Sequence, residues 1–238
     1  MLSRLLLLLA PALLLPSLAH AAPPAKHHAA KAPAAKDWSR TVALSPTGGH
    51  IIGNPAAKTH IIEYVSYTCP HCAHFVTEGT KPLNQGWVAK GTVAVEIRNL
   101  VRDRYDMTAA VLARCGGPAR FPALHEALFA NFQPWVEKLQ AYEKQPSTLP
   151  ENPAPAAVMT DVAEKTGLLT LAGKYGVTAA QAKQCFANQK TQDLVLAMTK
   201  TALGQDQVTG TPSFLINGKL TQAHDWSALR ALLPVLAN

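Results

Sequence analysis

The sequence predicts an α/β fold in which a large helical block interrupts a core of strands and helices. Strand-like segments at residues 60–66 and 92–97 enclose a helical segment. From about residue 101 to 205 the apolar residues recur at helical spacing. A hairpin pattern over 213–220 then leads into a closing helix predicted over 225–236.

The first half of the core is predicted from composition and periodicity. Residues 41–44 are a short strand candidate, and residues 60–66 are rich in β-branched and aromatic side chains, as in a buried strand. Residues 73–90 have a helical apolar pattern. Pro82 is expected to kink or interrupt this helix because proline has no amide donor. Residues 92–97 form the next predicted strand.

Capping residues and a proline-rich stretch divide the helical block. Thr178 and Gln181 have the spacing of a capping box, which predicts a helix start. Gly176 and Gly204 stand where helix C-caps are expected. The stretch 146–155 contains several prolines and is predicted to be a loop inside the block.

The N-terminal residues have the pattern of an export signal. Arg4 precedes an apolar run, and small residues follow it in a cleavage pattern. Prolines interrupt the run, which disfavours the alternative of a retained membrane anchor. Residues 1–21 are therefore predicted to be a signal peptide and residues 22–37 a flexible Ala/Pro/Lys linker. Export predicts a periplasmic location, where disulfides persist.

Composition and charge limit the classes of function. The chain has 238 residues, of which 48% are hydrophobic, and this excludes wholesale disorder. The formal net charge is +7, but Arg4 and the three lysines of the linker contribute much of it. The remaining charge of about +3 argues against nucleic acid as a partner.

A pair of cysteines at a strand-to-helix junction carries the predicted chemistry. Cys69 would lie at a helix N-terminus, where free N–H groups and the helix dipole stabilise a thiolate. Pro70 suits the first helical turn, and His71 can stabilise the same thiolate. Cys72 would be shielded and able to attack a mixed disulfide. Because a stabilised thiolate favours the reduced form, the disulfide becomes a stronger oxidant.

Other interpretations of this pair are a metal site and an inert disulfide. A C-x-x-C motif can be half of a zinc site, and the neighbouring histidines also suit a copper carrier. The other two cysteines, Cys115 and Cys185, are single and far apart, so no second pair completes a closed site and no metal site is predicted. A structural Cys69–Cys72 disulfide would close a loop too short to constrain the unfolded chain strongly.

Two motifs together resemble those of the DsbA-family thiol:disulfide oxidoreductases. Residues 61–72 resemble the family's active-site segment, including the Pro-His dipeptide between the cysteines, and residues 210–214 resemble its cis-proline loop. The resemblance extends from about Gly53 to the C-terminus and implies a thioredoxin-like fold with a helical domain inserted into the core. The implied domains are a thioredoxin-like domain at 38–100 and 206–238 and an inserted helical domain at 101–205.

The resemblance also implies roles for individual residues. Cys69 matches the nucleophile and Cys72 the resolving cysteine. Pro212 matches the cis-proline, which would present the Thr211 backbone to an extended substrate chain. Glu63 matches a buried acid that could relay a proton to or from Cys72. An exposed Glu63 is the alternative, but strand alternation favours burial.

The two cysteines of the helical block are expected to be bonded to each other. In an oxidising compartment a Cys115–Cys185 disulfide is favoured over two buried free thiols. The two remaining histidines near the motifs, His74 and His125, are expected on exposed helix surfaces.

The function implied by the resemblance is oxidation of cysteine pairs in secreted proteins by a Cys69–Cys72 disulfide. The expected partners are folding secreted proteins and a DsbB-type membrane quinone reductase, with no soluble cofactor and with the chain acting as a monomer. Thr211 departs from the strongest oxidases of the family, which often carry valine there, so the direction of the reaction stays open. The alternatives are a disulfide isomerase or reductase of the same fold and a copper-binding assembly factor.

Overall fold

The computed structural model describes residues 36–236. The predicted signal peptide at 1–21 and the predicted linker up to residue 35 lie outside the described residues. Within residues 36–236 no helix is both long and apolar enough to cross a membrane.

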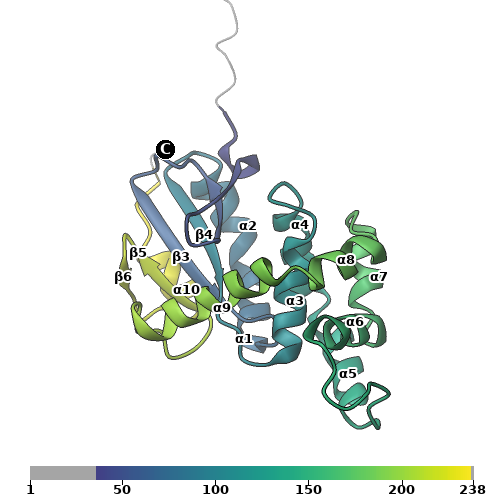
Figure 1. Ribbon diagram of the computed structural model, residues 1–238. Coiled ribbons are helices and arrows are strands. Elements are labelled where there is room, and N and C mark those ends of the chain that lie inside the picture. The colour runs from purple at the N-terminus through teal and green to yellow at the C-terminus, as the bar shows by residue number, and fades with distance from the viewer. Residues whose placement is uncertain (1–35, 237–238) are drawn as a thin grey trace, which may run out of the picture. The chain divides into compact units, whose positions relative to one another are not determined.

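A six-stranded mixed sheet organises the described part of the chain (Figure 1). Its strands lie in the order β1-β2-β4-β3-β5-β6. The pair β3 and β4 is parallel, and the other four neighbouring pairs are antiparallel. The strands are β1 (Val42–Leu44), β2 (His50–Gly53), β3 (Thr59–Val65), β4 (Val93–Asn99), β5 (Ser213–Ile216) and β6 (Lys219–Leu220).

The predicted core strands are confirmed, with boundaries displaced by one or two residues. β3 lies between β4 and β5, where Glu63 is opposite Ile97 on one side and Phe214 on the other. β2 was not expected, because its four residues lie between turn-forming residues and begin with a histidine. It pairs with β4 and extends the sheet away from β3.

The helix predicted over 73–90 begins three residues earlier and ends at Val88. Pro82 was expected to kink or interrupt this helix: the backbone stays helical through each junction, but π-helical segments before and after the proline interrupt the α-helix. Proline has no N–H to donate and its ring crowds the preceding turn. The wider π-helical turns on both sides make room for it. The segments are α1 (Pro70–Phe75), η2 (Val76–Thr80), α2 (Lys81–Leu83) and η3 (Asn84–Val88).

Helices fill the chain between β4 and β5, as the periodicity predicts. In Figure 1, α3 and α4 lie between the sheet and the group formed by α5 to α8, and α9 returns to the sheet, where it contacts β4. Buried apolar side chains of these helices join those of the sheet in one core. The helices are α3 (Arg104–Arg114), α4 (Phe121–Ala130), α5 (Phe132–Glu143), α6 (Pro155–Lys165), α7 (Leu168–Lys174), α8 (Ala179–Phe186) and α9 (Gln189–Gly204).

Two of the three predicted helix caps are confirmed. Thr178 and Gln181 form the complete capping box of α8, and Gly176 adopts the left-handed φ of 79° after α7. Gly204 does not cap α9, because it remains in the helix and the residue after it is also helical. The chain turns away from the helical conformation at Gln207, which adopts a left-handed φ of 54°.

The C-terminal hairpin has the predicted turn, and the helix after it is shorter than predicted. Asn217 and Gly218 both have positive φ, as a two-residue hairpin turn requires. The closing helix α10 spans Trp226–Ala231, with Asp225 as its N-cap. It does not reach residue 236, because Pro234 cannot donate the backbone hydrogen bond that would continue it.

A disulfide joins the end of α3 to α8. Cys115 and Cys185 are bonded, with Cα atoms 5.7 Å apart and a separation of 70 residues in sequence. Both side chains pack against the main core. The bond ties the first helix of the block to one of its last.

Removing this disulfide is expected to destabilise the protein. A bond that closes a loop of this length restricts the unfolded chain, so the Cys115→Ala/Cys185→Ala variant should lose about 4 kcal/mol of unfolding free energy. Urea unfolding of both proteins, with Cys69 and Cys72 fully reduced in each, measures the difference. An unchanged midpoint would show that the bond is absent or contributes nothing.

Candidate active site

Cys69 and Cys72 lie at the junction of β3 and α1. Cys69 is the N-cap of α1, and its carbonyl accepts the first helical hydrogen bond from Ala73 N–H at 3.2 Å. Pro70 occupies the first turn, where a missing amide donor costs nothing. Both thiols are free; Cys69 is 3% exposed and Cys72 is fully buried. Cys69 is therefore the cysteine that a substrate can reach.

The Thr211-Pro212 loop faces Cys69 from the other half of the chain. The peptide bond between these two residues is cis. Cys69 Sγ lies 3.2 Å from the Thr211 carbonyl oxygen, although the two residues are 142 positions apart in sequence. The antiparallel pairing of β3 with β5 brings the two motifs together.

The pKa values of the two thiols are shifted in opposite directions, down for Cys69 and up for Cys72. A hydrogen bond from the Cys72 thiol makes the largest contribution to lowering the pKa of Cys69 from 9 to about 5. The Thr211 side chain and the backbone N–H groups of His71 and Cys72 lower this pKa further. Burial raises the pKa of Cys72 well above its ordinary value, and its interaction with Cys69 raises it further. At neutral pH the pair therefore consists of a Cys69 thiolate and a Cys72 thiol.

Replacing Thr211 with valine tests the contribution of its side chain. The Thr211→Val variant loses a hydrogen bond to a charged sulfur, a contribution of about 1.5 kcal/mol, so the pKa of Cys69 should rise by about one. Titration of the thiolate absorbance of the reduced protein measures this pKa. A Cys69→Ser protein provides the baseline, and an unchanged titration would contradict the assignment.

Glu63 lies in β3, is buried, and has no polar partner for one of its oxygens. Its side chain is 3% exposed, and no hydrogen bond from the described residues reaches Oε1. Burial raises the pKa of Glu63 to about 8, so the carboxyl is protonated at neutral pH. A small cavity beside it is also lined by His125 and Glu126 of α4. Glu63 is thus a protonated carboxylic acid inside the core.

The expectation that His125 is exposed is wrong. His125 is 2% exposed, and its Nδ1 lies 2.9 Å from the Tyr67 hydroxyl. Burial, and secondly the charge of Arg114, lower the pKa of His125 to about 3, so the ring is neutral. The apolar positions of α4 do not reveal this burial, because the helix contacts both η2 and α3.

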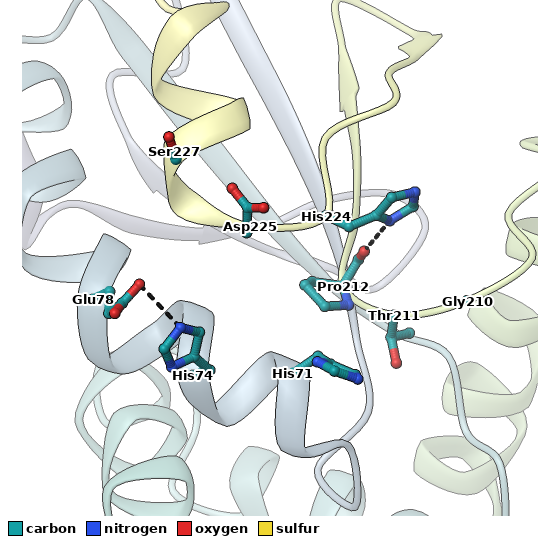
Figure 2. A pocket seen from close by; sticks show the side chains of 9 residues that line it. All are labelled: His71, His74, Glu78, Gly210, Thr211, Pro212, His224, Asp225 and Ser227. Carbon is teal, nitrogen blue, oxygen red and sulfur yellow. Dashed lines mark hydrogen bonds and ion pairs between the residues drawn. The ribbon is translucent and has the colours of Figure 1, made fainter.

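His71 and His74 both lie on the exposed side of the active-site helix. His71 acts on Cys69 through its backbone N–H, whereas sequence reasoning assigned that role to the imidazole. His74 Nε2 lies 3.2 Å from Glu78 Oε2 and is exposed, as expected. Figure 2 shows both imidazoles along one side of a groove beside the cis-proline loop.

Two positioning residues were not identified from the sequence. The buried carboxylate of Asp106 accepts a hydrogen bond from Tyr67 N–H at 2.7 Å. Arg102 donates to the Ser66 hydroxyl at 2.9 Å and to the Thr68 hydroxyl at 3.0 Å. These contacts hold the segment immediately before Cys69. Asp106 in the first turn of α3 was the only hint in the sequence. Its partner Tyr67 is 39 positions away, so the pairing could not be read from local sequence.

The described residues contain no group of three or more His, Cys, Asp or Glu side chains arranged to hold a metal ion.

Comparison with known proteins identifies the family. Residues 45–234 match a family model described as Thioredoxin. The chain belongs to the thioredoxin family. A solved thioredoxin-family relative, the protein-disulfide isomerase from Novosphingobium aromaticivorans, is 36% identical, with a TM-score of 0.69. The alignment covers 78% of this chain and 95% of that one.

More distant relatives agree with this thioredoxin-family assignment. The fold matches alpha-DsbA1 of Wolbachia pipientis with a TM-score of 0.62 at 19% identity, over 79% of this chain and 90% of that one. A Rickettsia conorii protein that carries the provisional name protein-disulfide oxidoreductase is 28% identical over 72% of this chain. The chain spans only 54% of that relative's length. The predicted thioredoxin-like fold and the resemblance to DsbA-type proteins are confirmed.

Proposed function

We propose that the chain is a periplasmic protein-disulfide oxidoreductase that donates its Cys69–Cys72 disulfide to folding secreted proteins. The observation that supports this most directly is the contrast between a stabilised thiolate at Cys69 and a shielded thiol at Cys72. A stabilised thiolate lowers the free energy of the reduced form, so the oxidised form is a strong oxidant. The names of the Novosphingobium and Rickettsia relatives agree with this class of reaction.

The reaction begins with the oxidised pair. A substrate thiolate attacks the Cys69 sulfur, the Cys69–Cys72 bond breaks, and Cys72 leaves as a thiolate. Glu63, which is protonated at neutral pH, supplies a proton to Cys72 and regains one from solvent. A second substrate thiolate then attacks the substrate sulfur of the mixed disulfide and releases Cys69. Two electrons pass from the substrate to the enzyme, and Cys69 remains a thiolate.

The cis-proline loop would hold the substrate during this exchange. The Thr211 carbonyl lies beside the Cys69 sulfur, so an extended substrate chain can pair with the loop backbone while its cysteine reaches Cys69. We further propose export through residues 1–21, a monomeric enzyme and reoxidation by a membrane protein that passes the electrons to a quinone. In this proposal the Cys69–Cys72 disulfide itself accepts the electrons, so the reaction needs no soluble cofactor.

Equilibration with glutathione buffers tests the direction of the reaction. An oxidase should have a reduction potential above about −200 mV, whereas a value near the −270 mV of thioredoxin would contradict the proposal. The oxidised protein should also convert a reduced dithiol peptide to its disulfide stoichiometrically. Failure of this transfer would reject an oxidase function at any potential.

Isomerase activity is the second candidate function. Thr211 before the cis-proline and the name of the Novosphingobium relative favour it. An isomerase would restore activity to a scrambled, fully oxidised protein when supplied in its reduced form. An oxidase would restore activity only to the reduced, unfolded protein.

A further inference from the structure

A polar groove lies beside the Thr211-Pro212 loop, whose Thr211 carbonyl oxygen contacts Cys69 (Figure 2). Its volume is about 560 Å³, within the range of ligand-binding sites. The active-site helix lines one side, the loop leading into α10 lines the other, and the cis-proline loop lies between them. The lining side chains are His71, His74, Glu78, Thr211, Pro212, His224, Asp225 and Ser227, with the backbone of Gly210.

The groove has negative charge on both sides. Glu78 lies on the active-site helix, and Asp225 lies at the start of α10. Asp225 accepts the Ala228 N–H through Oδ1, and no hydrogen bond from the described residues reaches its Oδ2. Glu78 Oε2 lies 3.2 Å from His74 Nε2. None of the described lining residues is lysine or arginine.

Among the lining residues, only Pro212 has a wholly apolar side chain, and Thr211 adds one methyl group. An apolar substrate segment placed here would remove water from carboxylates and imidazoles without replacing their hydrogen bonds, which is unfavourable. A cationic side chain would keep these groups paired. Exposed ion pairs of this kind contribute modestly, by up to about 1 kcal/mol each.

The groove is placed to contact residues next to the reacting cysteine. The Thr211 carbonyl, 3.2 Å from Cys69 Sγ, belongs to the loop at the groove's edge. His224 Nδ1 lies 2.8 Å from the Pro212 carbonyl oxygen, so this oxygen already has a partner inside the protein. Thr211, Glu78 and Asp225 line the same groove, so a substrate chain that pairs with Thr211 can place neighbouring side chains against these carboxylates.

We infer that this groove selects substrate segments that carry lysine or arginine beside the reacting cysteine. The inference rests on the proposed dithiol–disulfide exchange at Cys69 and names the class of substrate for that site. It predicts selection by charge in place of selection by apolar contact.

Three dithiol peptides test the inference. They share one sequence with a cysteine pair and differ only at flanking positions, which are lysine, glutamate or leucine on both sides of the pair. At pH 8 and low salt, kcat/KM for oxidation by the oxidised protein should be about three- to tenfold higher for the lysine peptide than for the glutamate peptide. The preference should weaken as salt is added, because salt screens exposed charges.

Matched variants assign the preference to the groove. In the Glu78→Gln/Asp225→Asn protein the ratio between the lysine and glutamate peptides should fall to about one. Asparagine retains the N-cap of α10, so the helix start is preserved. Glu151→Gln, at an exposed acid outside the groove, should leave the ratio as in the wild type.

The outcomes separate this inference from the proposed function. If no peptide is oxidised, the proposed function fails. If all three are oxidised at equal rates, or the leucine peptide is oxidised fastest, charge selection is wrong and the proposed function stands. A lysine preference that survives in the double variant would place the selection outside the groove and overturn the inference.

Discussion

The Cys69→Ser protein is expected to lose dithiol oxidation by several orders of magnitude, whereas the reduced Cys72→Ser protein is expected to form a persistent mixed disulfide. Cys69 has the lowered pKa of about 5 and contacts the Thr211 carbonyl of the cis-proline loop, so its thiolate attacks first. Cys72 is buried and protonated, so its role is to resolve the intermediate. Removing one or the other therefore stops the reaction at different stages.

Intact-mass measurement after incubation with a disulfide-bonded peptide distinguishes the two variants. Reduced Cys72→Ser should gain the mass of one half of the peptide, because the Cys69 thiolate displaces the other half as a thiolate. Reduced Cys69→Ser should gain nothing over the same time at pH 7. An adduct that formed equally fast in both proteins would show that the assignment of nucleophile and resolving cysteine is wrong.

The Glu63→Gln protein is expected to be more stable than the wild type at pH 8, by an amount on the order of 3 kcal/mol larger than at pH 5. Glu63 is buried with one oxygen unpartnered, and burial raises its pKa from 4.5 to about 8. Glutamine keeps the shape of the side chain and cannot ionise. The variant therefore removes the cost of keeping a carboxyl protonated inside the core.

The direction of this pH dependence follows from proton uptake. Between pH 4.5 and 8 the folded protein holds the Glu63 proton and the unfolded chain releases it, so wild-type stability falls as the pH rises through this window. Asp106, whose pKa burial raises to about 7, contributes in the same direction in both proteins and cancels in the comparison.

Urea unfolding of reduced protein at pH 5, 6, 7 and 8 measures this difference. Glu137→Gln, at an exposed glutamate of α5, controls for loss of a surface charge and should follow the wild type at each pH. Parallel stability curves for the wild type and Glu63→Gln would mean that Glu63 is ionised in the folded protein. Its proposed role as the proton donor to Cys72 would then be wrong.

Local features of the candidate site were predictable because neighbours in sequence create them. The strand ending near Val65, the helix start at Cys69 and the proline in its first turn all lie within one short segment. The free N–H groups of that helix start lower the pKa of Cys69 whatever the rest of the chain does. The left-handed residues of the hairpin turn were equally local.

Burial within the helical block was not predictable from local pattern. His125 falls on a helix whose apolar positions are compatible with an exposed histidine. It is buried because α4 packs against η2, which is far away in sequence, as well as against the preceding helix α3. β2 was missed for the same reason, because a four-residue strand is stabilised by its partner β4 and shows little signal of its own.

The sequence by itself determined the order of the main strands and helices without β2, the cysteine pair, the family resemblance and two of the three predicted helix caps. Only the tertiary structure decided that Thr211 meets Cys69, that Glu63 lacks a partner and that Glu78 and Asp225 lie on opposite sides of one groove. The reason is physical: a cap or a turn depends on hydrogen bonds between near neighbours, whereas burial, pKa shifts and the charge of a groove depend on side chains that only the folded chain brings together.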